Sequence, residues 1–245
     1  MPKIDWHYWS KFLEELEQAK EELNASKTAW YRGVVSEDHL LVPSLLRIPG
    51  GLKKEQHLFE RFAQIWRALN SSARSEFTDW DLLFEMQHYS VPTRLLDWTE
   101  TLGVAVFFAT LERNDKDSFI YVLNPIALNQ LVGKDDLIGQ WDRERFGYRN
   151  VFWRGDPFKP QNPIAINPLH SNPRLAAQRG RFTVHGVDIG PLEVSCGSCV
   201  RKIRLSKDAK PAAAEFLRMA GIDELDVFPD VAGAARFLMN MVGLR

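Results

Sequence analysis

Hydrophobic residues recur at helical spacing near the start of the chain. They follow Asp5, are separated by Glu and Lys, and stand at Trp6, Trp9, Leu13, Leu16 and Leu23. This period predicts an amphipathic helix over residues 5–25, with Asp5 as its cap. Lys20 interrupts the apolar stripe, which argues against a long coiled coil.

The same patterns predict the remaining elements. We expect further helices at 53–70, 78–88, 209–220 and 230–242, and a nearly all-apolar core helix that begins near Thr99. Branched and aromatic runs predict strands at 28–33, 94–97, 118–124, 175–185, 191–194 and 200–205, and residues 142–173 read as irregular. Helices followed by strands, with helices returning at the end, indicate an α+β fold with a central mixed or antiparallel sheet. We expect an N-terminal helix over 1–27 and one globular domain over 28–245.

Composition narrows the class of protein. The chain has 245 residues, of which 45% are hydrophobic and 26% charged, and a net charge of −1. These values are typical of a globular domain and exclude wholesale disorder. The strongly basic footprint of many nucleic-acid-binding domains is absent overall, although a local basic patch stays open. With two cysteines, no secretory signal and no long apolar run, we expect a cytoplasmic protein without a membrane segment.

Arg32 and Gly33 stand at the end of a predicted strand. A glycine there lets the backbone approach a ligand closely, and a guanidinium suits phosphate or ribose oxygens. Arg32 therefore either anchors a pyrophosphate-bearing ligand such as NAD, or is a buried cation paired with Asp97.

Arg94 and Asp97 lie three residues apart in a predicted strand, so they face opposite sides and each needs another partner. Asp97 could hold Arg32 or cap the following helix. Thr99 is either that cap or a hydroxyl directed at a ligand. His88 and Tyr89 precede the break at Pro92, where a histidine could act as acid or base and a tyrosine could stack on a ring.

Gln178 precedes Gly180 on a predicted strand. Cleavage of an N-glycosidic bond builds positive charge on the ribose, and a fixed amide dipole beside it would stabilise that charge. The alternative is an ordinary sheet or loop residue. A carboxylate would serve better, and Glu193 is one substitute.

Two other patterns carry weaker chemistry. Cys196 and Cys199 have the spacing of half a zinc site but no diagnostic partner, so we expect no metal. The segment that contains Arg143, Arg145, Arg149 and Arg154 interleaves basic and aromatic residues, which suits single-stranded nucleic acid or a solvated loop. No P-loop, Rossmann fingerprint or nucleophile elbow is present.

Several motifs together resemble the FRG domain, a family named for its Phe-Arg-Gly motif. The resemblance spans about residues 25–240 and rests on Trp30-Tyr31-Arg32-Gly33, Gln87-His88-Tyr89, Pro92-Thr93-Arg94-Leu95-Leu96-Asp97-Trp98-Thr99, Asn172-Pro173-Arg174 and Gln178-Arg179-Gly180. Tyr31 replaces the name-giving Phe. The family is associated with bacterial and phage genomes, often in toxin-like or antiphage defence settings.

The layout also resembles the ADP-ribosyltransferase superfamily. That resemblance makes Arg32 the first motif residue, Trp98-Thr99 the second and Gln178 the third. Together with the residue chemistry above, it leads us to expect catalytic roles for Gln178, Arg32 and His88, and an NAD site formed by Arg32, Gly33, Tyr89, Arg94, Asp97, Trp98 and Thr99. Two departures are that Trp98-Thr99 is not Ser-Thr-Ser and that no Glu-x-Glu stands near Gln178.

The resemblances imply an NAD-dependent enzyme that transfers ADP-ribose to a nucleic acid or protein, as a toxin or antiphage effector held in check by an antitoxin or defence-system partner. The alternatives are a non-catalytic module that binds nucleic acid or protein, and an NAD-binding pseudoenzyme.

Overall fold

The computed structural model describes residues 4–70, 78–112, 115–133, 147–155, 160–168, 173–187 and 190–244. Its sheet contains strands β1 (Trp30–Val34), β2 (Leu95–Thr99), β3 (Ser118–Leu123), β4 (Ile164–Ile166), β5 (Gly180–Val184) and β6 (Val200–Leu205). Around it lie α1 (His7–Glu22), α2 (Gly51–Leu69), α3 (Asp79–His88), α4 (Leu102–Ala109), α5 (Pro125–Gln130), the π-helical turn η1 (Asn150–Arg154), α6 (Pro173–Ala177), α7 (Leu192–Ser195), the 3-10 turn η2 (Lys207–Ala209), α8 (Lys210–Met219), α9 (Glu224–Val227) and α10 (Val231–Met241).

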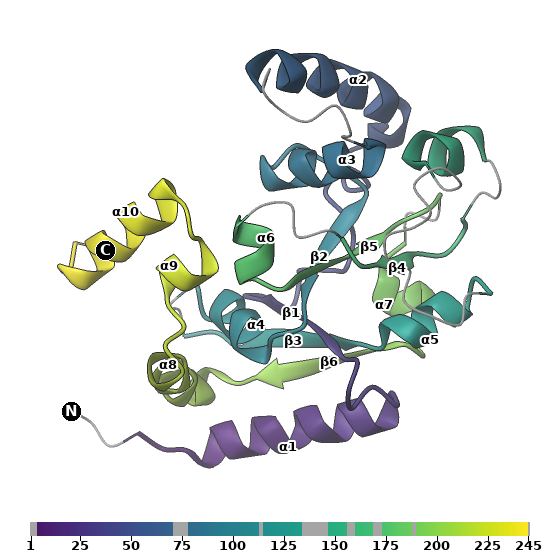
Figure 1. Cartoon of the computed structure of the whole chain (residues 1–245). Coiled ribbons are helices and arrows are strands. Elements are labelled where there is room, and N and C mark those ends of the chain that lie inside the picture. Colours follow the sequence, from purple (N-terminus) through teal and green to yellow (C-terminus); the bar gives the residue numbers. More distant parts are fainter. Residues whose placement is uncertain are drawn as a thin grey trace.

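The six strands form one sheet in the order β4-β5-β2-β1-β3-β6, and every neighbouring pair is antiparallel. The predicted α+β class, with a sheet flanked by helices, is confirmed (Figure 1).

The two central strands of the sheet, β1 and β2, are paired over the shortest length. β1 pairs with β3 over five residues and β2 pairs with β5 over five, but β1 and β2 share a single aligned pair, Tyr31 with Thr99. In Figure 1, β2 rises steeply away from β1 toward α3. Beyond Tyr31 and Thr99 the backbone ladder is absent between these strands, and side chains take its place.

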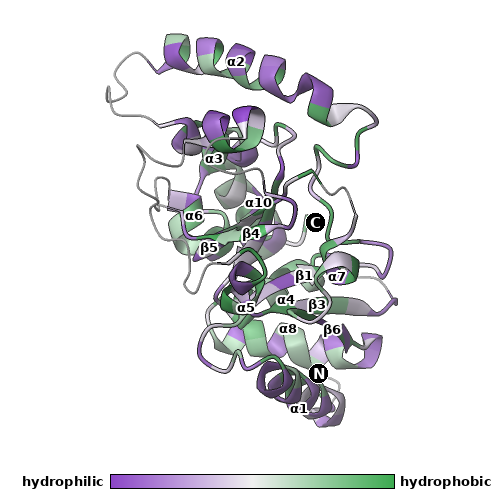
Figure 2. Cartoon of the chain, turned by 90° about the vertical axis from the view of Figure 1, so that its right-hand side faces the viewer, coloured by the Kyte–Doolittle hydropathy of each residue, from purple (hydrophilic) through white to green (hydrophobic). Residues whose placement is uncertain are grey.

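Three apolar clusters hold the layers together. One packs α1, α4 and α8 on the β1-β3-β6 half, and includes Trp9, Phe12, Leu16 and Tyr31. A second joins α2, α3 and η1 to β5, and a third lies on the other face beneath α5 and α7. Figure 2 shows α1 below the sheet and α2 at the opposite end. The N-terminal helix therefore shares its core with the β1-β3-β6 half.

The long helices and strands lie where the sequence predicted them, whereas several predictions for short elements were wrong. The expected strand at 191–194 is α7, and the expected strand at 175–185 is α6 followed by β5. Both short helices begin at a proline: Pro191 is the N-cap of α7 and Pro173 is the first residue of α6. Proline favours the start of a helix because its fixed φ suits the first turn. β4 lies inside the segment expected to be irregular, and α5 and α9 were not expected.

Where the structure is described, no helix is both long enough and apolar enough to span a bilayer.

Candidate functional site

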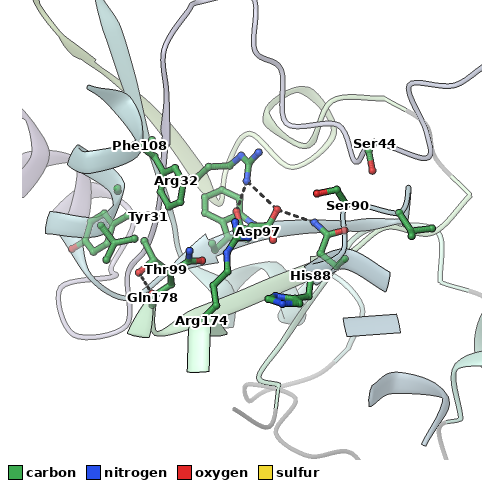
Figure 3. A pocket seen from close by; sticks show the side chains of 16 residues that line it. Tyr31, Arg32, Ser44, His88, Ser90, Asp97, Thr99, Phe108, Arg174 and Gln178 are labelled. Carbon is green, nitrogen blue, oxygen red and sulfur yellow. Dashed lines mark hydrogen bonds and ion pairs between the residues drawn. The ribbon is translucent and has the colours of Figure 1, made fainter. Parts of the chain in front are cut away.

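A pocket opens where β1 and β2 separate. Its volume is about 340 Å³, in the lower part of the range of small-molecule sites. One wall is apolar and includes Tyr31, Trp98, Val104, Ala105 and Phe108. The other is polar and includes Arg32, Gln87, His88, Asp97, Arg174 and Gln178 (Figure 3). A ligand with a ring and a charged group would suit such a pocket.

Arg32 bridges the gap between the two strands. Its Nη1 donates a hydrogen bond of 2.7 Å to the backbone oxygen of Asp97 and lies 3.7 Å from the Asp97 carboxylate. Burial lowers the pKa of Arg32, and the charge of Asp97 opposes that shift. The interpretation in which Asp97 holds Arg32 is therefore confirmed, and the interpretation of Asp97 as a helix cap is not.

The Asp97 carboxylate is itself held from the far side. Gln87 Nε2 donates to it at 2.8 Å, and Gln87 Oε1 accepts a hydrogen bond of 2.6 Å from Thr93 Oγ1. This chain of contacts connects the end of α3 to β2 and fixes the position of the carboxylate in the pocket.

Thr99 and Gln178 meet at the edge of the pocket. Thr99 Oγ1 donates to the Gln178 backbone oxygen at 2.6 Å and accepts from the Thr101 N–H at 3.0 Å. Gln178 Nε2 donates to the Val227 backbone oxygen at 3.0 Å. The sequence predicted that Gln178 lies on a strand. In the structure it lies in the turn between α6 and β5.

Gly33 is required for packing. A Cβ at this position would lie 1.8 Å from the backbone oxygen of Ala105 in α4. The space beside Gly33 is therefore filled by the helix, and its lack of a side chain serves the contact between β1 and α4. Gly33 is also one of the residues that line the pocket, so the expectation that it lets a ligand approach the backbone stays a prediction.

His88 lines the pocket from the last residue of α3. Tyr89 lies outside the lining residues, is 61% exposed, and makes an edge-to-face contact with the His88 ring at 4.9 Å. Trp98 is buried and its indole Nε1 donates to Thr183 Oγ1 at 3.1 Å, so it contributes a wall.

Arg94 is not part of the pocket lining. Its guanidinium is buried beneath α2, paired with Glu55 and bonded to the backbone oxygens of His185 and Gly186 at 2.9 and 3.0 Å. Tyr148 Oη and Trp153 Nε1 also donate to Glu55. The partner that sequence analysis required for Arg94 is therefore Glu55.

Glu193 also lies outside the lining residues. Its carboxylate accepts hydrogen bonds from the Leu41 N–H at 3.1 Å and from Tyr121 Oη at 3.3 Å. These contacts give it a structural role.

Sequence analysis did not select Arg174 as a site residue. This residue stands on α6 and lines the pocket, and in Figure 3 its side chain extends toward Asp97. Its guanidinium lies 4.7 Å from the centre of the Phe228 ring. The sequence signal that could have identified Arg174 was its place in the Asn172-Pro173-Arg174 motif. That motif belongs to the FRG resemblance but assigns no function to the arginine.

The remaining candidates lie elsewhere. Arg149 is paired with Asp79, and Arg143 and Arg145 lie outside the described residues. Cys196 and Cys199 are free buried thiols. Over the described ranges, no group of three or more His, Cys, Asp or Glu side chains is arranged to hold a metal ion.

The fold and the pocket define an α+β protein with a pocket lined by two arginines. Residues 27–118 match the family model of the FRG domain, which supports the FRG resemblance. The matched segment includes Arg32, Asp97 and Thr99 and ends before Arg174 and Gln178. Comparison with curated proteins and with solved structures gives no match.

Proposed function

We propose that the chain binds NAD in this pocket and transfers its ADP-ribose to a macromolecular acceptor. The observation that carries the proposal is a convergence. Arg32, Thr99 and Gln178 are the three positions selected by the ADP-ribosyltransferase resemblance, and all three line one pocket. They come from the first strand, from the strand that leads into α4, and from the turn before β5.

The proposed reaction exchanges one bond at the ribose. The bond between C1′ and the nicotinamide nitrogen breaks, and its electron pair leaves with neutral nicotinamide. A nucleophile of the acceptor forms the new bond to C1′ and gives up its proton, for which His88 is the base in the pocket. The positive charge that develops on the ribose needs a fixed acceptor nearby.

Two groups can provide that acceptor. Gln178 has its amide nitrogen fixed by Val227, and this contact orients the amide oxygen. Among the described residues that line the pocket, Asp97 alone carries a carboxylate, and it is held by Gln87. Neither Gln178 nor Asp97 is part of a Glu-x-Glu motif like the one in the superfamily. Because Gln178 stands at the position that the resemblance assigns to the third motif, the proposed catalysis depends on Gln178.

The test is nicotinamide release from NAD by the purified protein, with and without cell lysate to supply acceptors. We expect Gln178→Ala to lower the rate by about 100-fold, comparable to the loss of one charge-stabilising donor or acceptor. The matched control is Gln56→Ala on α2, since Gln56 is exposed and bonded only to Glu60 within the described structure. Equal rates for wild type and Gln178→Ala would contradict the assignment.

The missing Glu favours the pseudoenzyme as second candidate. It predicts that NAD raises the melting temperature and that no nicotinamide is released under either condition. If NAD has no effect on melting and none is consumed, the binding-module alternative replaces both.

A further inference from the structure

Two arginines, Arg32 and Arg174, line the pocket, and a third, Arg236, shares the Phe228 ring with Arg174. Arg32 is bonded to the backbone and carboxylate of Asp97. Arg236 forms a salt bridge of 2.9 Å with Glu224. Within the described part of the chain, no hydrogen bond or ion pair reaches the Arg174 guanidinium.

Arg174 is nevertheless held in place. Its guanidinium lies 4.7 Å from the centre of the Phe228 ring, and Arg236 lies at the same distance from that ring. The ring is fixed by edge contacts with Phe107 and Phe108 of α4. Stacking on an aromatic ring orients the guanidinium while leaving its N–H donors free.

The electrostatics around Arg174 favour an anion. The lining residues include two arginines and one carboxylate, so the pocket has a net charge of about +1. Burial lowers the pKa of Arg174, while Asp97 and Asp230 oppose that shift through space. A guanidinium stays protonated in such a setting. Its donors therefore lack the pairing that a partly buried cation normally has.

We propose that Arg174 binds the diphosphate of a nucleotide ligand in this pocket. The inference rests on the proposed function and moves the anchoring role from Arg32, where the resemblance puts it, to Arg174. A guanidinium with free donors can bind two phosphate oxygens at once. Arg32 lacks that freedom because it bridges β1 and β2. The apolar wall around Phe108 suits the ring that such a ligand carries.

The experiment measures the Kd of ADP-ribose and of inorganic pyrophosphate by calorimetry. Four proteins are compared: wild type, Arg174→Ala, Arg174→Lys and the control Arg218→Ala. Arg218 is 72% exposed, is paired with Glu215 on α8, and is not one of the lining residues. Melting temperatures confirm that each variant is folded.

We expect Arg174→Ala to weaken ADP-ribose and pyrophosphate about 10- to 100-fold, the effect of losing hydrogen bonds to a charged group. Lysine keeps the charge but not the fork, so Arg174→Lys should fall between wild type and alanine. If alanine unfolds the protein, the lysine variant provides the test. Arg218→Ala should bind as wild type does.

The outcomes separate this inference from the proposed function. Tight binding of both anions that needs Arg174, without nicotinamide release, supports the diphosphate site and refutes ADP-ribosyl transfer. Wild-type affinity in a folded Arg174→Ala, or no binding of either anion by the wild type, overturns the diphosphate site, whatever the turnover of NAD.

Discussion

Replacing one partner of the buried Arg94–Glu55 pair should destabilise the fold strongly, because the other charge would be left in the core. The side chains of both residues are 5% exposed. Arg94 Nε donates to Glu55 at 2.7 Å, and its Nη1 donates to backbone oxygens next to β5. Tyr148 and Trp153 complete the shell around the carboxylate. The pair thus joins α2, β2 and η1.

The magnitude follows from this burial. Removing one member of a buried, hydrogen-bonded ion pair costs about 3–5 kcal/mol, because the remaining charge is desolvated without a partner. We expect Arg94→Met and Glu55→Leu each to fall in this range. The double variant Arg94→Met/Glu55→Leu should cost less than the sum of the two singles, since it leaves no charge behind.

Urea unfolding followed by tryptophan fluorescence measures these free energies. The control is Glu60→Gln on the same helix, where the carboxylate accepts one hydrogen bond from Gln56 near the surface. It should change stability by no more than about 0.5 kcal/mol. Single variants as mild as this control, or a double variant equal to the sum, would refute the reasoning. Folded Arg94→Met should also bind ADP-ribose as wild type does, since Arg94 lies outside the pocket lining.

Two further changes test the packing around the sheet. Gly33→Ala should lower the free energy of unfolding by about 3 kcal/mol, because its Cβ would overlap the Ala105 backbone oxygen; a urea midpoint equal to that of wild type would contradict this. His185 is buried beside Arg94, and burial lowers its pKa to about 3. At a pH between 6.5, the ordinary pKa of histidine, and about 3, His185 takes up a proton in the unfolded chain but not in the folded one. The free energy of unfolding therefore decreases as the pH falls through this range. The contribution lost at about pH 4.5 is about 3 kcal/mol. The free energy of unfolding of His185→Gln should therefore fall less on acidification than that of wild type. If the two proteins lose stability in parallel as the pH falls, the effect is excluded.

Much of the fold follows from periodicity. α1, α2 and α10 have long apolar stripes, and β3 and β6 have branched, aromatic or alternating residues, so their positions were predicted to within a few residues. The errors concern elements of three to six residues, such as β4, α7 and α5. Runs this short complete less than two helical turns or a few alternations, so their conformation depends on neighbours that sequence reasoning does not place.

The candidate site divides in the same way. The contact between Arg32 and Asp97 was among the sequence interpretations, because strand alternation excluded Arg94 as the partner of Asp97. The partner of Arg94 is 39 residues away on α2, and the ring that holds Arg174 is Phe228, the C-cap of α9. Such pairings depend on how the elements pack, which spacing along the chain does not reveal.

The motif Tyr31-Arg32-Gly33 is accounted for by packing, and this decides where the function must be tested. Tyr31 belongs to the core beneath α4, Arg32 replaces missing backbone hydrogen bonds between β1 and β2, and Gly33 admits the backbone of α4. A substitution in this motif disturbs the sheet and the pocket together, so loss of activity there would not distinguish a catalytic residue from a structural one. Among the described residues no such bond reaches Arg174, so its variants are the ones that separate ligand binding from folding.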